Sequence, residues 1–155
     1  MGYSVWIMKV SKQFVTPITI SSVWSFVADI RKIGSCLPDA QPLDGATESE
    51  AIIRMKFKIG FIRKTVDMKS KVIARDPRKN VTFESESTDV RVRGSLNLLE
   101  VDPNQTQLSY ELDVTPLSAI AHTAVSLIGD GMIQDITVAF ADRLKTKIES
   151  EHQTA

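Results

Sequence analysis

Cysteine and histidine are scarce in this sequence: Cys36 is the single cysteine, and His122 and His152 are the two histidines. One cysteine excludes an internal disulfide framework, and it leaves no thiol cluster to hold zinc or an iron–sulfur centre. The two histidines do not make a conventional metal site with their sequence neighbours. We therefore expect no metal and no cofactor, and a protein that folds in the reducing cytoplasm.

Net charge and long apolar segments are also lacking. Nineteen Lys and Arg residues are balanced by nineteen Asp and Glu residues, which removes the simplest argument for nucleic-acid binding. No apolar run reaches the roughly 18 residues of a membrane-spanning helix. Gly129-Asp130-Gly131 lies in a helical pattern and has neither the preceding strand nor the Lys-Ser/Thr ending of a phosphate loop. We therefore expect one soluble domain, residues 1–155, with no nucleic-acid partner.

The N-terminal region predicts a strand followed by two short helices. Residues 5–15 mix alternation with β-branched and aromatic residues and stop at a Thr-Pro pair, which is typical of a strand end. Residues 18–33 place apolar side chains at helical spacing, with Ser21 or Ser22 as the expected cap of the first helix and Asp29 as that of the second. The proline of the following Cys-Leu-Pro-Asp segment disfavours further helix.

Residues 41–116 predict a series of antiparallel strands. Apolar and charged residues alternate through most of this segment, so that one face is dry and the other wet, as in an antiparallel sheet covered on one side. Turn residues divide the strands. The expected turns are Asp44-Gly45, Gly60, Asp76-Pro77, Gly94 and Asp102-Pro103-Asn104.

Residues 118–149 predict one long amphipathic helix, whose apolar residues recur every four positions from Ile120 to Ile148. At 1.5 Å per residue this helix is about 45 Å long. Gly129 and Gly131 each cost about 1 kcal/mol relative to alanine in a helix interior. Two interpretations stay open: close backbone packing or a kink, and a helix locally thinned or bent beside a cavity.

Several short motifs resemble those of a known family. They are Phe14-Val15-Thr16-Pro17-Ile18, Val23-Trp24-Ser25-Phe26, Ile33, Cys36-Leu37-Pro38-Asp39-Ala40, Phe57-Lys58-Ile59-Gly60, Ala74-Arg75-Asp76-Pro77 and Ile128-Gly129-Asp130-Gly131. With the order of elements, they resemble the family of the carbon monoxide dehydrogenase G subunit, within the START-like helix-grip (birch pollen allergen) superfamily. Asp39 stands where the family usually has glycine. The resemblance implies an α+β helix-grip fold: a curved antiparallel sheet of about seven strands, two short helices after the first strand, and a long C-terminal helix over the sheet.

The resemblance also implies a binding or accessory role. START-like proteins enclose an apolar cavity between sheet and helix, and the dehydrogenase's G subunit is an accessory protein associated with assembly or membrane recruitment. We expect a non-enzymatic protein that binds an apolar small molecule or lipid, such as an isoprenoid quinone, and that serves an oxidoreductase. The dry face supplies adaptable thioethers and aromatic walls. The expected cavity lining is Met55, Phe57, Val66, Met68, Phe83, Val92, Leu96, Tyr110, Leu112, Ala124, Ile128, Met132 and Ile136.

Alternatives remain for the individual residues. The apolar set could pack entirely as core, and the acids Glu84 and Glu86 fall on the wet face, where they suit solvation or pairing with lysines better than catalysis. Cys36 is expected to be a buried, inert thiol. The alternative function is an enzyme of the cyclase or hydratase type, with Tyr110 or His122 as its acid–base group.

Neutrality conceals a separation of charge along the chain. Residues 51–75 contain eight basic residues and one acid, and residues 94–142 contain seven acids and no Lys or Arg. Basic side chains near an anionic bilayer contribute on the order of 1 kcal/mol each, so this block predicts a docking surface for a membrane or an oxidoreductase. Neutralisation by Glu84 and Glu86 is the alternative. The predicted docking residues are Arg54, Lys56, Lys58, Arg63 and Lys64.

Overall fold

The computed structural model describes residues 8–37, 39–59 and 62–154, with the side chains of residues 8, 57–59, 62, 120, 124–137 and 152–154 outside the description. The chain begins with a strand and two short helices, continues with six strands, and ends in a long helix. In order, the elements are β1 (Met8–Thr16), α1 (Ile20–Val27), α2 (Ile30–Gly34), β2 (Ala40–Pro42), β3 (Glu50–Ile59), β4 (Ile62–Asp76), β5 (Asn80–Glu86), β6 (Val90–Asp102), β7 (Gln105–Pro116) and α3 (Ala119–Thr154).

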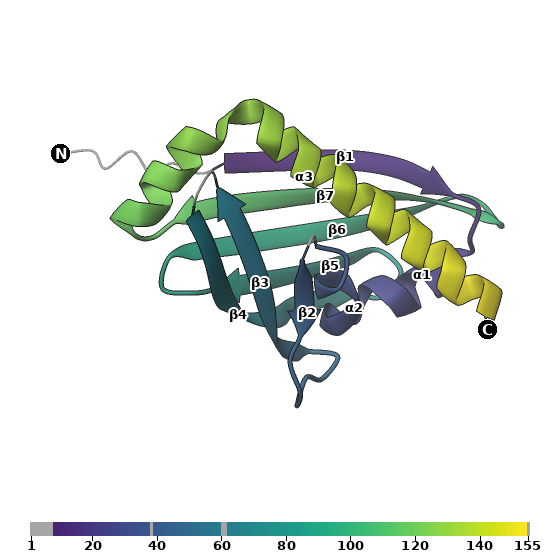
Figure 1. Ribbon diagram of the computed structural model, residues 1–155. Coiled ribbons are helices and arrows are strands. Elements are labelled where there is room, and N and C mark those ends of the chain that lie inside the picture. The colour runs from purple at the N-terminus through teal and green to yellow at the C-terminus, as the bar shows by residue number, and fades with distance from the viewer. Residues whose placement is uncertain (1–7, 38, 60–61, 155) are drawn as a thin grey trace.

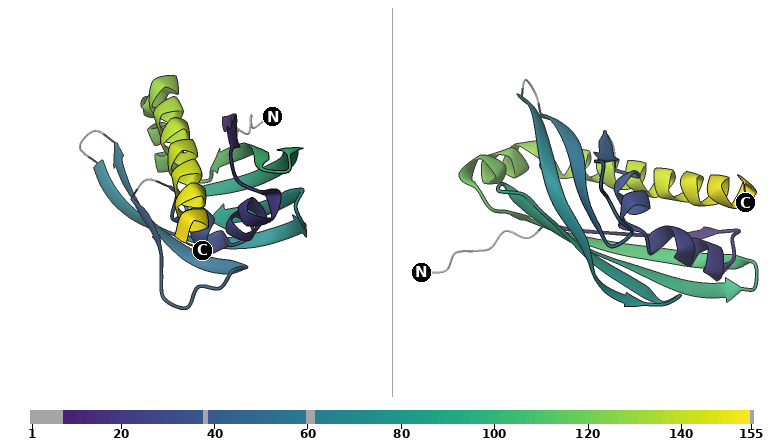
Figure 2. Two further views of the ribbon diagram at one scale, coloured as in Figure 1. Left: turned by 90° about the vertical axis from the view of Figure 1, so that its right-hand side faces the viewer. Right: turned by 90° about the horizontal axis from the view of Figure 1, so that it is seen from below.

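The strands of the described residues form one seven-stranded sheet in the order β1-β7-β6-β5-β4-β3-β2. Every pair is antiparallel, and chain neighbours pair throughout except that β1 pairs with β7. The sheet curls, and α3 runs along its concave side together with α1 and α2 (Figures 1 and 2). The expected helix-grip architecture is confirmed. None of the described helices has the length and apolar character needed to cross a bilayer.

The two short helices begin at side-chain caps. The Asp29 carboxylate accepts from the Arg31 backbone N–H at 2.9 Å, as predicted for the second helix. The cap of α1 is Thr19 and not Ser21 or Ser22, because the extended backbone of Thr19 lets its hydroxyl accept from the Ser22 backbone N–H.

Asp39 lies just before β2 in the left-handed backbone region, with φ 53°. Glycine adopts this conformation most easily, and aspartate and asparagine are the side-chain-bearing residues that tolerate it best. Its carbonyl accepts from the Lys56 backbone N–H at 3.2 Å, which joins the turn to β3. Aspartate can therefore occupy this turn, which a β-branched residue would strain.

Helix α3 continues through both of its glycines without a break. Its axis changes direction in the green N-terminal half (Figure 1), a bend that is compatible with both interpretations of Gly129 and Gly131. The C-terminal half is straight and lies over α1 and the sheet (Figure 1).

The hydrophobic core lies between the sheet, α1, α2 and the C-terminal half of α3. Its members are apolar residues at most 7% exposed, and burying each large side chain contributes about 1.5–3 kcal/mol. They include Val23, Phe26 and Val27 of α1, Ile30 and Ile33 of α2, Phe140, Leu144 and Ile148 of α3, and Val81, Phe83, Leu96, Leu98, Leu108 and Tyr110 of the sheet.

Gly94 lies inside β6 and not in a turn, which corrects the expectation from the sequence. A Cβ atom at this position would lie 2.2 Å from Cζ of Phe83, so the phenylalanine ring covers the glycine directly. The residue therefore serves close packing within the sheet rather than a change of chain direction.

Candidate functional site

The concave face of the sheet is fully covered at one end and half covered at the other. Along the β6–β7 pair, Leu98 opposite Leu108 and Leu96 opposite Tyr110 are buried. Further along the same strands, Val92 opposite Val114 is only half-buried, as is Leu112. Since residues two positions apart share a face, the apolar face continues beyond the part that the core covers. We call the covered part the packed end.

The half-covered part is here called the open inner face. It consists of inward-facing, half-buried side chains from neighbouring strands, and it offers apolar surface to a guest. Its members are Val10 of β1, Ser85 of β5, Val92 of β6, and Leu112 and Val114 of β7.

A pair of hydroxyl groups borders the open inner face. Ser70 and Ser85 lie opposite each other on β4 and β5, with their Oγ atoms 2.6 Å apart. Ser70 also donates to the Met68 carbonyl at 3.3 Å. Both bonds form together only if Ser85 donates to Ser70, which leaves the half-buried Ser85 oxygen as an acceptor. The pair therefore offers one hydrogen-bond acceptor beside the apolar surface.

Tyr110 lies at the packed end. Its ring meets Phe140 of α3 edge-on, with centroids 5.0 Å apart and an interplanar angle of 81°. Burial, together with the nearby Asp142 carboxylate, raises the pKa of Tyr110 to about 12. The phenol therefore stays protonated at neutral pH.

The predicted cavity residues fall into several groups. Phe83, Leu96 and Tyr110 belong to the hydrophobic core. Val66 and Met68 are buried but are not members of that cluster, Met55 and Leu112 are half-buried and pack against it, and Val92 is half-buried. The side chains of Phe57, Ala124, Ile128, Met132 and Ile136 lie outside the described part of the structure.

The C-terminal half of α3 is fixed to the packed end by polar contacts as well as by burial. Lys147 Nζ donates to the Ser35 carbonyl at 2.8 Å, and the Thr16 hydroxyl donates to Glu149 Oε1 at 3.0 Å. Lys32 pairs with Glu151 at the last turns. These contacts tie the helix to α2 and to the end of β1.

The start of α3 is fixed by a different group, Asp89 in the β5–β6 turn. Ser118 caps the helix, because its Oγ accepts from the Ala121 backbone N–H at 3.1 Å. The same hydroxyl donates to Asp89 Oδ1 at 2.9 Å, and Lys64 Nζ donates to Asp89 Oδ2 at 2.7 Å. The hydrogen bonds from Lys64 and Ser118 lower the pKa of Asp89. Sequence reasoning missed Asp89, which no motif marks.

The wet face of the sheet carries charges in alternating order across six strands. Directly paired positions follow one another from β3 to β7 and then to β1. Each pair of opposite charges in such positions stabilises the strand register by about 0.2–1 kcal/mol. The row runs Glu50, Lys71, Glu84, Arg93, Asp113 and Lys9.

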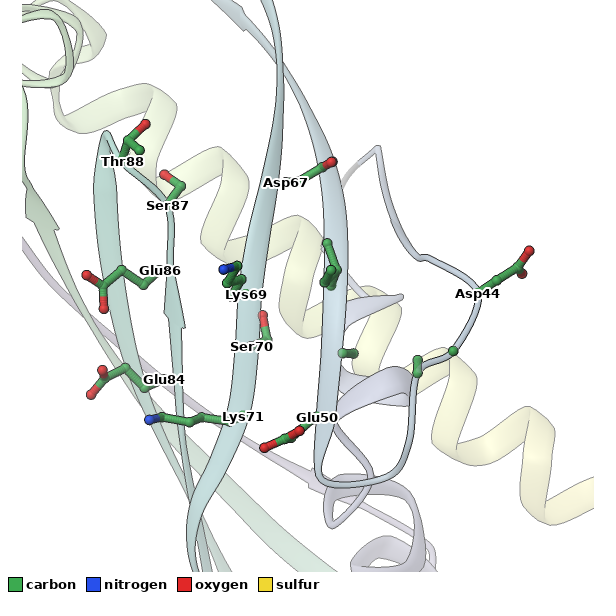
Figure 3. Close-up of a pocket in the computed structure, with 14 residues that line it drawn as sticks. Asp44, Glu50, Asp67, Lys69, Ser70, Lys71, Glu84, Glu86, Ser87 and Thr88 are labelled. Atoms are coloured by element: carbon green, nitrogen blue, oxygen red, sulfur yellow. The ribbon is translucent and has the colours of Figure 1, made fainter.

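A shallow depression of about 810 Å³ lies over β3, β4, β5 and the loop after β2. Lys71 extends toward Glu84 across it, and Lys69 lies opposite Glu86 in the strand register (Figure 3). Because acids and bases alternate here, the depression offers no patch of one charge. Most of its lining lies on the wet face, and Ser70 is the lining residue that also borders the open inner face.

The predicted docking residues are unevenly neutralised. Arg54 makes two hydrogen bonds to Asp67, at 2.9 and 3.1 Å, and Lys64 pairs with Asp89. No ion pair among the described residues involves Lys56 or Arg63, both of which are exposed. The backbone of Lys58 pairs with Arg63, and the Lys58 side chain lies outside the description. The uncompensated charge therefore gathers where β3 ends and β4 begins, which is here called the far end of the β3–β4 hairpin.

The two remaining candidates for chemistry differ in burial. Cys36 is fully buried, its Sγ donates to the Lys32 carbonyl at 3.4 Å, and burial raises the pKa of the thiol to about 11. A neutral, enclosed thiol is a poor nucleophile. His122 is exposed in the first turn of α3.

A family model for the G subunit of carbon monoxide dehydrogenase (CoxG) matches residues 13–150. The chain belongs to the CoxG family. The match covers most of the chain and confirms the resemblance drawn from the short motifs. Among curated proteins, none matches this sequence.

Solved structures of other proteins share the fold of this CoxG family member at low sequence identity. A conserved protein from Geobacillus kaustophilus aligns with TM-score 0.70 and 15% identity over 92% of this chain and 96% of its own. A START superfamily protein from Mycobacterium smegmatis aligns with TM-score 0.65 and 14% identity, over 92% of this chain and 97% of its own. The ZhuI aromatase/cyclase from Streptomyces sp. R1128 aligns with TM-score 0.66 and 14% identity, over 93% of this chain and 94% of its own. These likenesses support the START-like fold.

Proposed function

We propose that this protein is a non-enzymatic accessory protein that binds an apolar small molecule or lipid, such as an isoprenoid quinone, at the open inner face. The observation that carries the proposal is the half-burial of Val92, Leu112 and Val114 on the side of the sheet that is otherwise core. Exposed apolar surface costs free energy at about 25 cal/mol per Å², and a guest removes it from water. Family membership supports an accessory role.

The test compares two matched substitutions. Val92→Gln places an amide on the open inner face, and Ile52→Gln does the same on the wet face, where Ile52 is 42% exposed. Native mass spectrometry after gentle purification should detect an apolar species on the wild type and on Ile52→Gln, and less of it on Val92→Gln. Lipid extract should raise the melting temperature of the wild type and of Ile52→Gln more than that of Val92→Gln. A wild type that retains no apolar species and that no lipid stabilises would refute the proposal.

An enzymatic function is the second candidate, because the same fold carries an aromatase/cyclase. The environment of Tyr110 favours the first proposal, since a buried phenol with a pKa of about 12 cannot act as a base near neutral pH. His122 is exposed, so its imidazole lacks the dry surroundings of a water-excluding reaction site. A turnover assay with a polyketide-like substrate, run on the wild type and on Tyr110→Phe, would reveal catalysis if it exists.

We further propose that the far end of the β3–β4 hairpin docks on an anionic membrane, where the guest is collected or delivered on behalf of an oxidoreductase. Lys56 and Arg63 carry this proposal, because their charges are exposed and uncompensated by the described residues. Arg63→Glu should abolish sedimentation with phosphatidylglycerol vesicles. Lys79→Glu reverses an exposed charge at the opposite end of β4 and should leave binding intact. Equal binding by both variants would contradict the proposal.

A further inference from the structure

Asp89 joins two parts of the molecule that serve different steps of the proposed function. Its Oδ2 accepts from Lys64 of the basic hairpin at 2.7 Å, and its Oδ1 accepts from the Ser118 hydroxyl at 2.9 Å. Its carbonyl also accepts from the Leu117 backbone N–H at 2.7 Å. One residue therefore contacts both the predicted docking surface and the segment that begins α3.

The turn around Asp89 fixes its place in the fold. The Ser87 hydroxyl accepts from the Asp89 and Val90 backbone N–H groups, each at 3.2 Å. The turn is closed by a bond of 2.9 Å from the Ser87 N–H to the Val90 carbonyl. The carboxylate can rotate, but its backbone cannot follow Lys64 if the lysine moves away.

The two partners of this ion pair differ in their access to solvent. The Lys64 side chain is 48% exposed, and the Asp89 side chain is 23% exposed. An external anion therefore reaches the lysine more easily than an external cation reaches the carboxylate. Arg63 precedes Lys64 along β4 and carries a charge that no described acid offsets, but alternation places its side chain on the other face of the strand. A surface rich in phosphate is the partner that this exposed ammonium group fits.

The start of α3 depends on Asp89 in a way that its end does not. The C-terminal half is held by Phe140, Leu144 and Ile148 in the core and by polar contacts such as Lys147 to Ser35. The first turn begins at Ser118, whose hydroxyl both caps the helix and binds Asp89. A change at Asp89 therefore acts on the first turn of α3.

We propose that Lys64 and Asp89 form a switch that couples membrane docking to access to the open inner face. Anionic lipid draws Lys64 away from Asp89; the carboxylate, without its cation, turns toward water and releases Ser118; the start of α3 then moves and admits or releases the guest. The inference rests on the proposed function, because it assumes both a guest and a membrane. It adds the link between them.

The experiment uses the wild type, Asp89→Asn, Lys64→Gln and the matched control Glu86→Gln. Glu86 pairs with Arg91 at 3.2 Å on the same β5–β6 hairpin but touches neither Lys64 nor Ser118. Hydrogen exchange of residues 119–123 is measured with phosphatidylglycerol vesicles and with phosphatidylcholine vesicles. Uptake of the neutral apolar probe N-phenyl-1-naphthylamine is measured by stopped flow without vesicles.

Phosphatidylglycerol should speed exchange at the start of α3 in the wild type by roughly two- to fivefold, the population change that loss of a partly exposed ion pair produces. Phosphatidylcholine should have no effect. Asp89→Asn and Lys64→Gln should exchange fast and take up the probe faster even without vesicles, whereas Glu86→Gln should match the wild type. Lys64→Gln serves as the second variant if Asp89→Asn does not fold.

Two failures are distinguishable. If all variants bind the probe but phosphatidylglycerol leaves exchange unchanged, or if Lys64→Gln and Asp89→Asn match Glu86→Gln, the switch is overturned and the binding function stands. If no variant binds the probe and no lipid is retained, the proposed function itself fails. Faster exchange caused by an oxidoreductase but not by vesicles overturns lipid as the partner.

Discussion

At the packed end, α1, α2 and the C-terminal half of α3 bury one part of the concave face, and each helix is fixed by caps or polar contacts. At the other end, the same face carries the half-buried Val92, Leu112 and Val114. There the described contacts that hold the start of α3 to the β5–β6 turn pass through Asp89. The first end has the features of a stable core and the second those of a binding surface.

The comparison suggests how one sheet can serve both stability and binding. A core needs close packing, because interior voids and unpaired polar groups are costly. A surface for a guest must remain incompletely covered, so its stability has to come from elsewhere. The buried residues of the packed end supply that stability.

The largest expected effect tests the packed end. Leu144 of α3 is 0% exposed within the core, so Leu144→Ala should lower the free energy of unfolding by about 3 kcal/mol through lost burial and the cavity it creates. Val138→Ala is the control on the same helix, because Val138 is 42% exposed, and it should cost less than about 0.5 kcal/mol. Urea unfolding at equilibrium measures both. Similar losses in the two variants would mean that α3 is not anchored as described.

The next effect concerns the boundary between the two ends. Gly94→Ala places a Cβ atom 2.2 Å from the Phe83 ring, and this overpacking should cost about 2 kcal/mol. Phe83→Leu shortens the opposing side chain, so the double variant should recover part of the loss. A double-mutant cycle from urea unfolding gives the coupling. Strict additivity would show that Phe83 does not cover Gly94.

A smaller effect is expected on the open inner face. Leu112 is half-buried, so Leu112→Ala removes less apolar burial than Leu144→Ala and should cost about 1 kcal/mol. If Leu112 contacts the guest, the same substitution should weaken lipid stabilisation in thermal unfolding, which Leu144→Ala should leave in place at a lower baseline. A loss of stability in Leu112→Ala as large as in Leu144→Ala would show that the open inner face is ordinary core.

The helix-grip fold was predictable from the sequence because its signals are local. Alternation through residues 41–116 identifies the dry face, and four-residue spacing identifies α3. Gly94 was misread because a glycine inside a strand and a glycine in a turn have the same local signature, and only Phe83 on β5 distinguishes them. Long-range contacts decide such cases.

The candidate site was predictable only in part. Inward-facing residues could be named, but alternation does not say which of them α3 covers, so Leu96 and Leu112 could not be separated in advance. The basic block was visible along the chain, whereas its neutralisation depends on cross-strand register. Arg54 meets Asp67 across β3 and β4, and Lys64 meets Asp89 from another hairpin.

The smallest expected effect contrasts two acids in acidic solution. The side-chain hydrogen bond from Arg31 lowers the pKa of Asp29 at the packed end, and that from Arg54 lowers the pKa of Asp67 on the wet face, both from an ordinary 3.8. A carboxyl group whose pKa is lower in the folded state stabilises the fold above its ordinary pKa, and this contribution is lost as the pH falls through the folded value. Stability should therefore decline as the pH falls below about 4.

Asp29→Asn keeps a capping side chain and should flatten this decline in stability more than Asp67→Asn does. The Asp29 side chain is 11% exposed, whereas that of Asp67 is 44% exposed, so solvent screens the Asp67 pair more strongly. Urea midpoints measured at several pH values give both slopes, and equal flattening would mean that burial at the packed end does not strengthen the Asp29 pair.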